Sequence, residues 1–295
     1  MMVNDALGTR MKEFYEQVPK TRLTRRTPVA IRLDGKAFHT FTRGFGKPFD
    51  DVLAATMMNT MKYLCENIQG CVFGYTQSDE ITLILIDYQT LNTDAWFNYE
   101  VQKMCSISAS MATLAFNKYF PLAIEDRKNY ITLKNLFKSE DDKKTDFEET
   151  YKKALDKGAM FDSRCFNIPK EEVANLIYWR QLDASRNSIQ MVGQANFSQA
   201  ELEGKSCNDI QDMLMTQKGI NWNDFPTYCK RGSCCVRVPS EEPTITKTVS
   251  DDSWCGGIYK KVSRYWNWQI DLDIPIFKGE DRNYIEQFIY VGEGL

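Results

Sequence analysis

Histidine is almost absent from this sequence of 295 residues, which contains only His39. A single imidazole excludes zinc sites built from several histidines and mechanisms that need a histidine pair. Long apolar runs are also missing, because no stretch approaches the ~20 residues that a membrane-spanning helix needs. The N-terminal residues MMVNDALGTRMKEFYEQV mix charged and apolar side chains, unlike a secretion signal. These absences favour a soluble cytoplasmic protein without a membrane partner.

A disulfide framework is not expected either. The nine cysteines are odd in number and form no CxxC pair. Residues such as Cys71 in the run CVFGY are expected to be reduced and buried, as in a cytoplasmic protein. A zinc site formed by Cys229, Cys234 and Cys235 is the less favoured alternative under the spacing rules for zinc ligands.

Charge of one sign does not dominate, since the formal net charge is −3. The molecule as a whole therefore does not attract polyanions. Basic residues nevertheless gather in KTRLTRR (20–26) and at Lys230 and Arg231, whereas residues 139–150 and 240–252 are acid-rich. A local basic stripe fits a nucleic acid bound at one face, and the alternative is an ordinary solvated surface.

Periodicity predicts alternating strands and helices. Strands are expected at residues 29–35, 71–76, 81–86 and 160–168, with short aromatic strands such as 265–272 in the last third. Helices are expected at residues 4–18, from 50 onward, and at 96–118, 169–192 and 206–217. This order predicts an α+β fold, an α/β sandwich whose antiparallel sheet is covered by helices on one face.

The chain is expected to hold one catalytic domain and two additions. The domain spans residues 1–240 and the C-terminal extension spans 241–295. Residues 121–158 are charged and poor in glycine and proline, which predicts a helical or flexible insertion outside the core.

Two carboxylates carry the strongest chemical signal. Asp34 ends an apolar strand and precedes Gly35, and Asp79 lies at the tip of a predicted hairpin between Ser78 and Glu80. Carboxylates at neighbouring strand ends can converge, and a divalent cation such as Mg²⁺ removes their repulsion. Two ions would then clamp the oxygens of an in-line phosphoryl displacement, the layout of a polymerase-like palm. Taken alone, both motifs also fit ordinary polar turns.

Longer motifs surround these carboxylates. The segments RLDGKAFHTFTRGFGKPFD (32–50) and GYTQSDE (74–80) closely resemble signature blocks of the tRNA(His) guanylyltransferase family. The similarity continues through KMCSISASMATLAF (103–116), FDSRCFNIP (161–169) and YWRQLD (178–183). It therefore covers most of residues 20–240.

The resemblance implies a palm-fold, Mg²⁺-dependent nucleotidyltransferase that extends tRNA from 3′ to 5′ and assembles as a homotetramer. Such enzymes activate a tRNA 5′-monophosphate with ATP, or with GTP in some members, and the 3′-hydroxyl of an incoming nucleotide then attacks. A 5′-triphosphate end needs no activation. The implied metal ligands are Asp34, the carbonyl of Gly35, and Asp79, with Glu80 as a further catalytic residue. The implied nucleotide-binding residues are Gly35, Lys36, Ala37, Phe38, His39, Lys47, Asp50 and Ser78.

Other positions are candidates for contacts with phosphate or RNA. Lys47 lies between Gly46 and Pro48 and can present a point charge to a triphosphate. His39 lies in the apolar run FHTF, and the alternative to a contact with nucleotide is that its side chain packs in the core. Phosphate binding is expected for Lys103, Ser110 and Arg164, each of which can instead make a plain salt bridge or helix-surface contact. The candidates for tRNA contacts are Arg22, Arg25, Arg26, Arg180, Asn187, Lys230 and Arg231.

One block departs from the family pattern. Eukaryotic members carry HINNLYN after the WRQ motif, whereas residues 185–191 here read SRNSIQM, in which only Asn187 matches. This departure resembles the bacterial and archaeal guanylyltransferase-like branch, and it favours template-dependent repair of 5′-truncated tRNA over untemplated guanylylation of tRNA(His). A palm-type nucleotide cyclase and a non-catalytic RNA-binding module are the less favoured alternatives.

Overall fold

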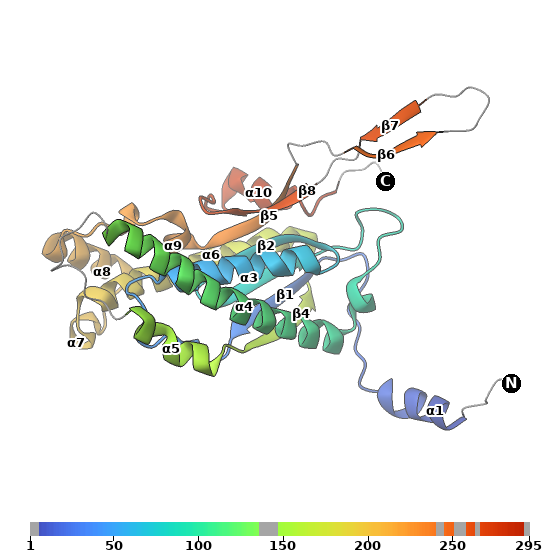
Figure 1. Cartoon of the computed structure of the whole chain (residues 1–295), viewed down its shortest axis with the longest axis horizontal. Helices are drawn as coiled ribbons and strands as arrows, with labels where there is room; N and C mark the ends of the chain where they lie inside the picture. Colours follow the sequence, from blue (N-terminus) through green and yellow to red (C-terminus); the bar gives the residue numbers. More distant parts are fainter. Residues whose placement is uncertain (1–5, 136–146, 240–244, 251–257, 263–265, 292–295) are drawn as a thin grey trace.

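The computed structural model describes residues 6–135, 147–239, 245–250, 258–262 and 266–291. Its centre is a six-stranded sheet in the order β4-β1-β3-β2-β5-β8, and all neighbouring strands are antiparallel (Figure 1). The strands are β1 (Val29–Gly35), β2 (Cys71–Gln77), β3 (Glu80–Leu85), β4 (Phe161–Asn167), β5 (Ser233–Pro239) and β8 (Trp266–Asp271). A separate ladder joins β6 (Ile245–Ser250) and β7 (Ile258–Val262). The predicted antiparallel sheet is confirmed.

Four long helices pack on or beside the sheet, and shorter ones connect them. The long helices are α3 (Asp51–Asn67), α4 (Val101–Asn135), α5 (Phe147–Lys157) and α6 (Lys170–Asn196). The shorter α-helices are α1 (Ala6–Met11), α2 (Phe38–Phe41), α7 (Gln199–Leu202), α8 (Cys207–Met213), α9 (Thr227–Arg231) and α10 (Asn283–Glu286). Single π or 3-10 turns are η1 (Lys12–Glu16), η2 (Trp96–Tyr99), η4 (Leu214–Lys218), η5 (Trp222–Asp224) and η6 (Gly279–Arg282).

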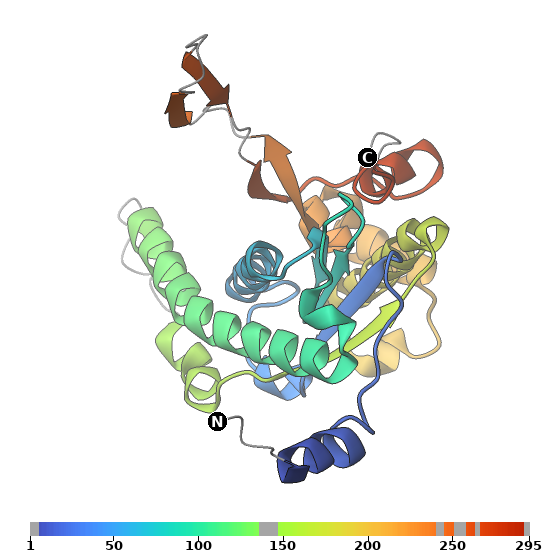
Figure 2. The same cartoon turned by 90° about the vertical axis from the view of Figure 1, so that its right-hand side faces the viewer.

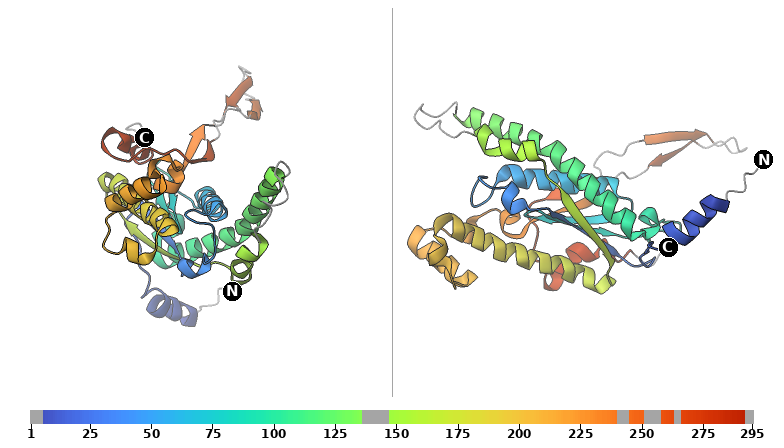
Figure 3. Two further views of the ribbon diagram at one scale, coloured as in Figure 1. Left: turned by 90° about the vertical axis from the view of Figure 1, so that its left-hand side faces the viewer. Right: turned by 90° about the horizontal axis from the view of Figure 1, so that it is seen from below.

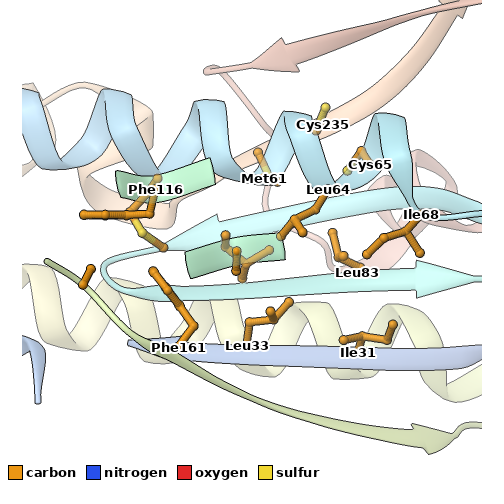
Figure 4. Packing of buried hydrophobic residues seen from close by; sticks show 14 of the residues in the cluster. Ile31, Leu33, Met61, Leu64, Cys65, Ile68, Leu83, Phe116, Phe161 and Cys235 are labelled. Carbon is orange, nitrogen blue, oxygen red and sulfur yellow. The ribbon is translucent and has the colours of Figure 1, made fainter. Parts of the chain in front are cut away.

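The sheet is apolar on both faces. Val29, Ile31 and Leu33 of β1 pack with α3 and α4, whereas Ala30, which points the other way, belongs to the cluster under α6 and α10. Figure 4 shows Ile31 and Leu33 among the buried side chains of the first cluster. In Figure 2 the helices α3 and α6 lie on opposite sides of the strands. This corrects the expectation of helices on one face only, because alternating side chains of the same strand are apolar and each needs cover.

Part of the predicted insertion belongs to the core. Of residues 121–158, the structure describes the end of α4 and all of α5, and residues 136–146 lie outside the described residues. Tyr151 and Ala154 of α5 are each 5% exposed, and the Tyr151 ring lies 5.9 Å from that of Phe120 on α4. Figure 3 shows α5 alongside α4. The prediction of a segment outside the core was wrong for α5, because Tyr151 and Ala154 pack into the cluster that contains Phe116 and Phe120 of α4.

The body continues beyond residue 240. The edge strand β8 pairs with β5, and Ile274, Phe277, Ile285 and Ile289 are buried in the cluster under α6. Residues 266–291 therefore complete the same sheet and core. Of the predicted C-terminal extension, residues 241–244, 251–257, 263–265 and 292–295 lie outside the described residues, and they include Cys255 and most of the acidic run.

The N-terminal helix stands apart from this body. In Figures 1 and 3, α1 and η1 extend away from the sheet, and no residue of either is buried. None of the helices in the described part of the chain combines the length and the apolar character needed to cross a membrane.

Candidate active site

Asp34 and Asp79 lie at one end of the sheet. Asp34 is near the end of β1, where its Cα partners are Glu80 of β3 and Asp162 of β4. Asp79 occupies the two-residue turn between β2 and β3, and its carbonyl oxygen accepts a hydrogen bond of 3.1 Å from the Gly35 amide. The hairpin turn therefore holds Asp79 beside the end of β1.

Both carboxyl groups are harder to ionise than a solvated one. Burial raises the pKa of Asp79 from 3.8 to about 6, and the charge of Asp34 adds to this, while a hydrogen bond of 3.0 Å from Ser78 Oγ opposes it. Burial also raises the pKa of Asp34, and the negative charges of Glu80 and Asp162 contribute. Because an opposite charge relieves such repulsion, the pair favours a bound cation.

Gly35 is required by packing in this structure. A Cβ at this position would lie 2.3 Å from a ring carbon of Phe38, which is 4% exposed. The following turn is tight, since Ala37 has a φ of 57°, which few residues other than glycine adopt. This turn leaves the side chains of Lys36 and His39 exposed next to the carboxylates.

A cavity of about 430 Å³ opens beside Asp79. Its lining combines α2, the loop before α3, the β2–β3 turn and the C-terminal half of α6. The lining residues are Phe38, His39, Thr42, Phe45, Gly46, Lys47, Pro48, Asp50, Leu53, Ser78, Asp79, Met191 and Gln194. Of the predicted nucleotide-binding residues, Phe38, His39, Lys47, Asp50 and Ser78 line this cavity together. Gly35, Lys36 and Ala37 do not line it, although they lie in the adjoining turn.

Asp50 organises the loop that carries Lys47. Its Oδ1 accepts a hydrogen bond of 2.9 Å from the Leu53 amide and so caps α3, and its Oδ2 accepts one of 2.8 Å from the Gly46 amide. These two bonds close a short loop in which the Lys47 side chain is exposed at the cavity. The sequence suggested nucleotide contact for Asp50; the structure gives its carboxylate oxygens backbone partners on the loop.

Glu80 is held by ion pairs. Its carboxylate lies 3.0 Å from Arg32 Nη2 and 3.3 Å from Arg180 Nε, and it accepts a hydrogen bond of 2.9 Å from Gln77 Nε2. Arg180 in turn contacts Asp183 on the same helix. Glu80, the residue that follows Asp79, therefore joins β3 to α6 through its ion pair with Arg180.

Four of the basic residues predicted to contact tRNA have partners within the protein. Arg180 is only 5% exposed, so it does not reach an RNA surface in this structure. Lys230 is 8% exposed and donates to the Asn223 carbonyl. Arg25 pairs with the buried Asp87, and Arg26 donates to the carbonyls of the loop after β3. Burial therefore argues against an RNA contact for Arg180 and Lys230, whereas the Arg25 and Arg26 side chains are exposed and their RNA contacts stay predictions.

The other predicted contacts are exposed but lie in different places. Arg164 forms an exposed pair with Asp162 near Asp34, and Asn187 is exposed on α6. Ser110 lines an open groove between α4 and β4. The Lys103 ammonium lies 6.0 Å from the centroid of the Phe97 ring of η2, and Arg22 forms an isolated β-bridge with Glu100. Arg231 is partly exposed on α9.

The oxygen ligands at this site fit a hard cation better than zinc. The Asp34 and Asp79 carboxylates and the Gly35 carbonyl offer only oxygen donors. Within the described ranges, no three His, Cys, Asp or Glu side chains gather into a metal site. Cys234 and Cys235 belong to the two clusters on opposite faces of the sheet, so they cannot converge with Cys229 as the zinc alternative required.

Several residues at the candidate site escaped the sequence prediction. Met191 and Gln194 line the cavity from α6, and helical spacing from Asn187 was the only available signal. Thr42 and Leu53 flank the predicted Lys47 loop. Nothing in the sequence indicated that Arg32 and Arg180 would meet at Glu80, because that contact depends on the position of α6.

Comparisons with known proteins show the family of this chain. A family model described as tRNAHis guanylyltransferase matches residues 8–169, more than half of the chain. The chain is 26% identical over 227 residues to the tRNA(His) guanylyltransferase of Saccharomyces cerevisiae, covering 71% of this chain and 82% of the yeast protein.

Two solved structures of a bacterial tRNA(His) guanylyltransferase-like protein are also similar. The complex with ATP superposes with a TM-score of 0.73 at 38% identity, and the complex with GTP with a TM-score of 0.70 at 36% identity. Each covers 97% of this chain and 100% of the bacterial chain. The chain is therefore a nucleotidyltransferase that belongs to the tRNAHis guanylyltransferase family.

Proposed function

We propose that this protein adds nucleotides to the 5′ end of tRNA in the 3′-to-5′ direction, with ATP or GTP and the incoming nucleoside triphosphates as substrates. The observation that carries the proposal is the 430 Å³ cavity lined by Asp79, the carboxylate that the hairpin turn holds beside the end of β1. Lys47 and His39 stand at this cavity, where they can meet the phosphates of a triphosphate. The bacterial relatives that hold ATP and GTP support the same ligand class.

The proposed chemistry consists of two phosphoryl displacements. In the first, an oxygen of the tRNA 5′-monophosphate attacks the α-phosphate of ATP or GTP and pyrophosphate leaves. In the second, the 3′-hydroxyl of the incoming triphosphate attacks the activated 5′-phosphate and the nucleoside monophosphate leaves. A tRNA with a 5′-triphosphate enters at the second step. The protein contributes mainly orientation and charge in such reactions.

We infer that Asp34, Asp79 and the Gly35 carbonyl would hold Mg²⁺. The raised pKa values of both carboxyl groups support this, because burial and neighbouring negative charges make each carboxylate costly to ionise without a cation. When bound, Mg²⁺ supplies positive charge at the phosphate oxygens. Glu80 then acts beside the site: its pairs with Arg32 and Arg180 support a role in positioning the β2–β3 turn.

The first test removes each carboxylate. Asp34→Ala and Asp79→Ala should lose transfer to a 5′-triphosphorylated, 5′-truncated tRNA supplied with each nucleoside triphosphate separately, while circular dichroism stays unchanged. Asp156→Ala, at an exposed position of α5, is the matched control and should transfer normally. Transfer at the wild-type rate by either active-site variant would refute the proposed site. Turnover of a labelled triphosphate without tRNA would favour the cyclase alternative.

The finer proposal is template-dependent repair of 5′-truncated tRNA. It is supported by residues 185–191, where only Asn187 matches the eukaryotic block. Pairing with the opposite strand would then select the nucleotide, and the protein would recognise tRNA by shape. In a competition assay, truncated tRNA should be extended in preference to full-length tRNA(His), and equal or reversed preference would favour guanylylation of tRNA(His) instead.

Self-association as a homotetramer is also proposed. It is supported by the exposed apolar side chains of α1 and η1, which recur at helical spacing through Leu7, Met11, Phe14 and Tyr15 and are followed by the exposed Val18. Light scattering should give the mass of four chains, and replacing Leu7 and Phe14 by serine should lower that mass. A monomeric wild-type protein would contradict this proposal.

A further inference from the structure

The loop that carries Lys47 is anchored on both sides of the lysine. On the C-terminal side, Asp50 closes the loop through its bond to the Gly46 amide. On the N-terminal side, the Phe45 ring is buried at 6% exposure among aromatic rings. The position of Lys47 at the cavity therefore depends on Phe45 and Asp50.

One side chain from α5 contacts both anchors. The Tyr151 hydroxyl donates a hydrogen bond of 2.8 Å to Asp50 Oδ2, the same oxygen that accepts from the Gly46 amide. The Tyr151 ring packs edge-on against Phe45, with a distance of 4.8 Å between ring centroids. Tyr151 is 5% exposed, and its burial together with the contact to Asp50 raises the pKa of its hydroxyl, which therefore stays protonated as a donor.

Tyr151 is placed to act on the loop and not on the ligand itself. It does not line the cavity, whereas Phe45, Lys47 and Asp50 do. Its hydroxyl is directed at a carboxylate that already holds two backbone amides, which gives Asp50 Oδ2 a second donor in addition to Gly46. A side chain of this kind acts on the ligand only through the loop.

We propose that Tyr151 is a positioning residue of the nucleotide site: through Phe45 and Asp50 it sets the Gly46–Asp50 loop so that Lys47 faces the triphosphate. The proposal rests on the proposed function, because it takes a nucleoside triphosphate as the ligand of the cavity. It assigns a role to α5, which the sequence alone placed outside the core. The hydroxyl orients Asp50, and the ring supports the start of the loop.

The decisive variant is Tyr151→Phe, which keeps the ring and removes only the hydroxyl. A hydrogen bond to a charged group is worth about tenfold or more in an equilibrium constant. Because only part of that effect reaches the ligand through the loop, the Kd for ATP should rise by up to about tenfold. The KM for the incoming triphosphate should rise likewise while kcat changes less. Tyr130→Phe, at an exposed tyrosine of α4, is the control and should bind ATP as the wild type does.

Two further measurements separate positioning from a general loss of structure. The affinity for AMP, which lacks the two outer phosphates, should be the same for Tyr151→Phe and the wild type. In a double-mutant cycle, Tyr151→Phe should add little once Lys47→Ala has removed the charge that the loop presents. Because Tyr151→Leu also removes the ring contact, it should raise the Kd for ATP further than Tyr151→Phe does.

The outcomes are distinct. Unchanged ATP affinity in Tyr151→Phe, an equal loss for AMP, or full additivity with Lys47→Ala would each overturn the proposal while leaving the proposed function intact. If the wild-type protein bound no triphosphate at all, the proposed function and this inference would both fall. A loss specific to the triphosphate and dependent on Lys47 would establish the positioning role.

Discussion

Neutralising Asp79 is expected to stabilise the protein while abolishing transfer. Burial raises the pKa of this carboxyl group from 3.8 to about 6, so the folded protein binds the proton more tightly than the unfolded chain. The free energy of unfolding therefore falls as the pH rises from about 4 to about 6, and it stays lower above that range. A shift of two pKa units corresponds to roughly 3 kcal/mol.

The substitution Asp79→Asn keeps the size of the side chain and an oxygen that can accept from Ser78, but it removes the charge. At pH 8 without divalent cations, the variant should gain on the order of 3 kcal/mol relative to the wild type. Because the entropy of unfolding grows with chain length, this gain corresponds to roughly 5 °C in Tm for a chain of this size. At pH 4 the gain should shrink towards zero, since the wild-type carboxyl group is then protonated in the folded state.

Calorimetry at pH 4 and pH 8 in the presence of EDTA measures both values. Asp156→Asn, at an exposed position of α5, is the control and should leave Tm unchanged at either pH. Adding Mg²⁺ should raise the Tm of the wild type more than that of Asp79→Asn, because the variant has lost a ligand. If the variant were no more stable than the wild type at pH 8 in EDTA, the ionised Asp79 carboxylate would not destabilise the folded protein, and the argument would be refuted.

Two other variants test the ion pairs. Arg180→Gln leaves Glu80 and Asp183 without their buried partner, and the free energy of unfolding in urea should fall by about 3 kcal/mol. The exposed Arg186→Gln should lower it by less than about 1 kcal/mol, and equal losses would show that burial of the pair is unimportant. Arg25→Gln should lower Tm, because its partner Asp87 is fully buried. Arg22→Gln should keep Tm, and the slope of the logarithm of the tRNA binding constant against the logarithm of the salt concentration should become shallower by about 1. The reverse pattern would identify Arg25 as the RNA contact.

The sequence by itself determined the strands and the chemistry placed on them. The run VAIRLDG is apolar up to Asp34, and GYTQSDE interrupts two apolar runs with a polar turn, so local pattern located both carboxylates at strand ends. The loop between Gly44 and Pro48 and the helix after Asp50 were also evident from glycine, proline and helical spacing. Each of these features depends on neighbours a few residues away, and local sequence encodes such features directly.

Only the tertiary structure decided which charged side chains have partners within the protein. The basic run 20–26 looks like an RNA-binding stripe, yet Arg25 and Arg26 bind the loop after β3, and Arg180 is buried against Glu80. The packing of α5 on α4 and the pairing of β8 with β5 likewise join segments far apart in the chain. Composition and periodicity do not report such long-range partners. An arginine that will form an ion pair and an arginine that will be solvated can stand in the same local sequence. The folded chain therefore decides which of the predicted residues meet at the cavity and which only hold it in place.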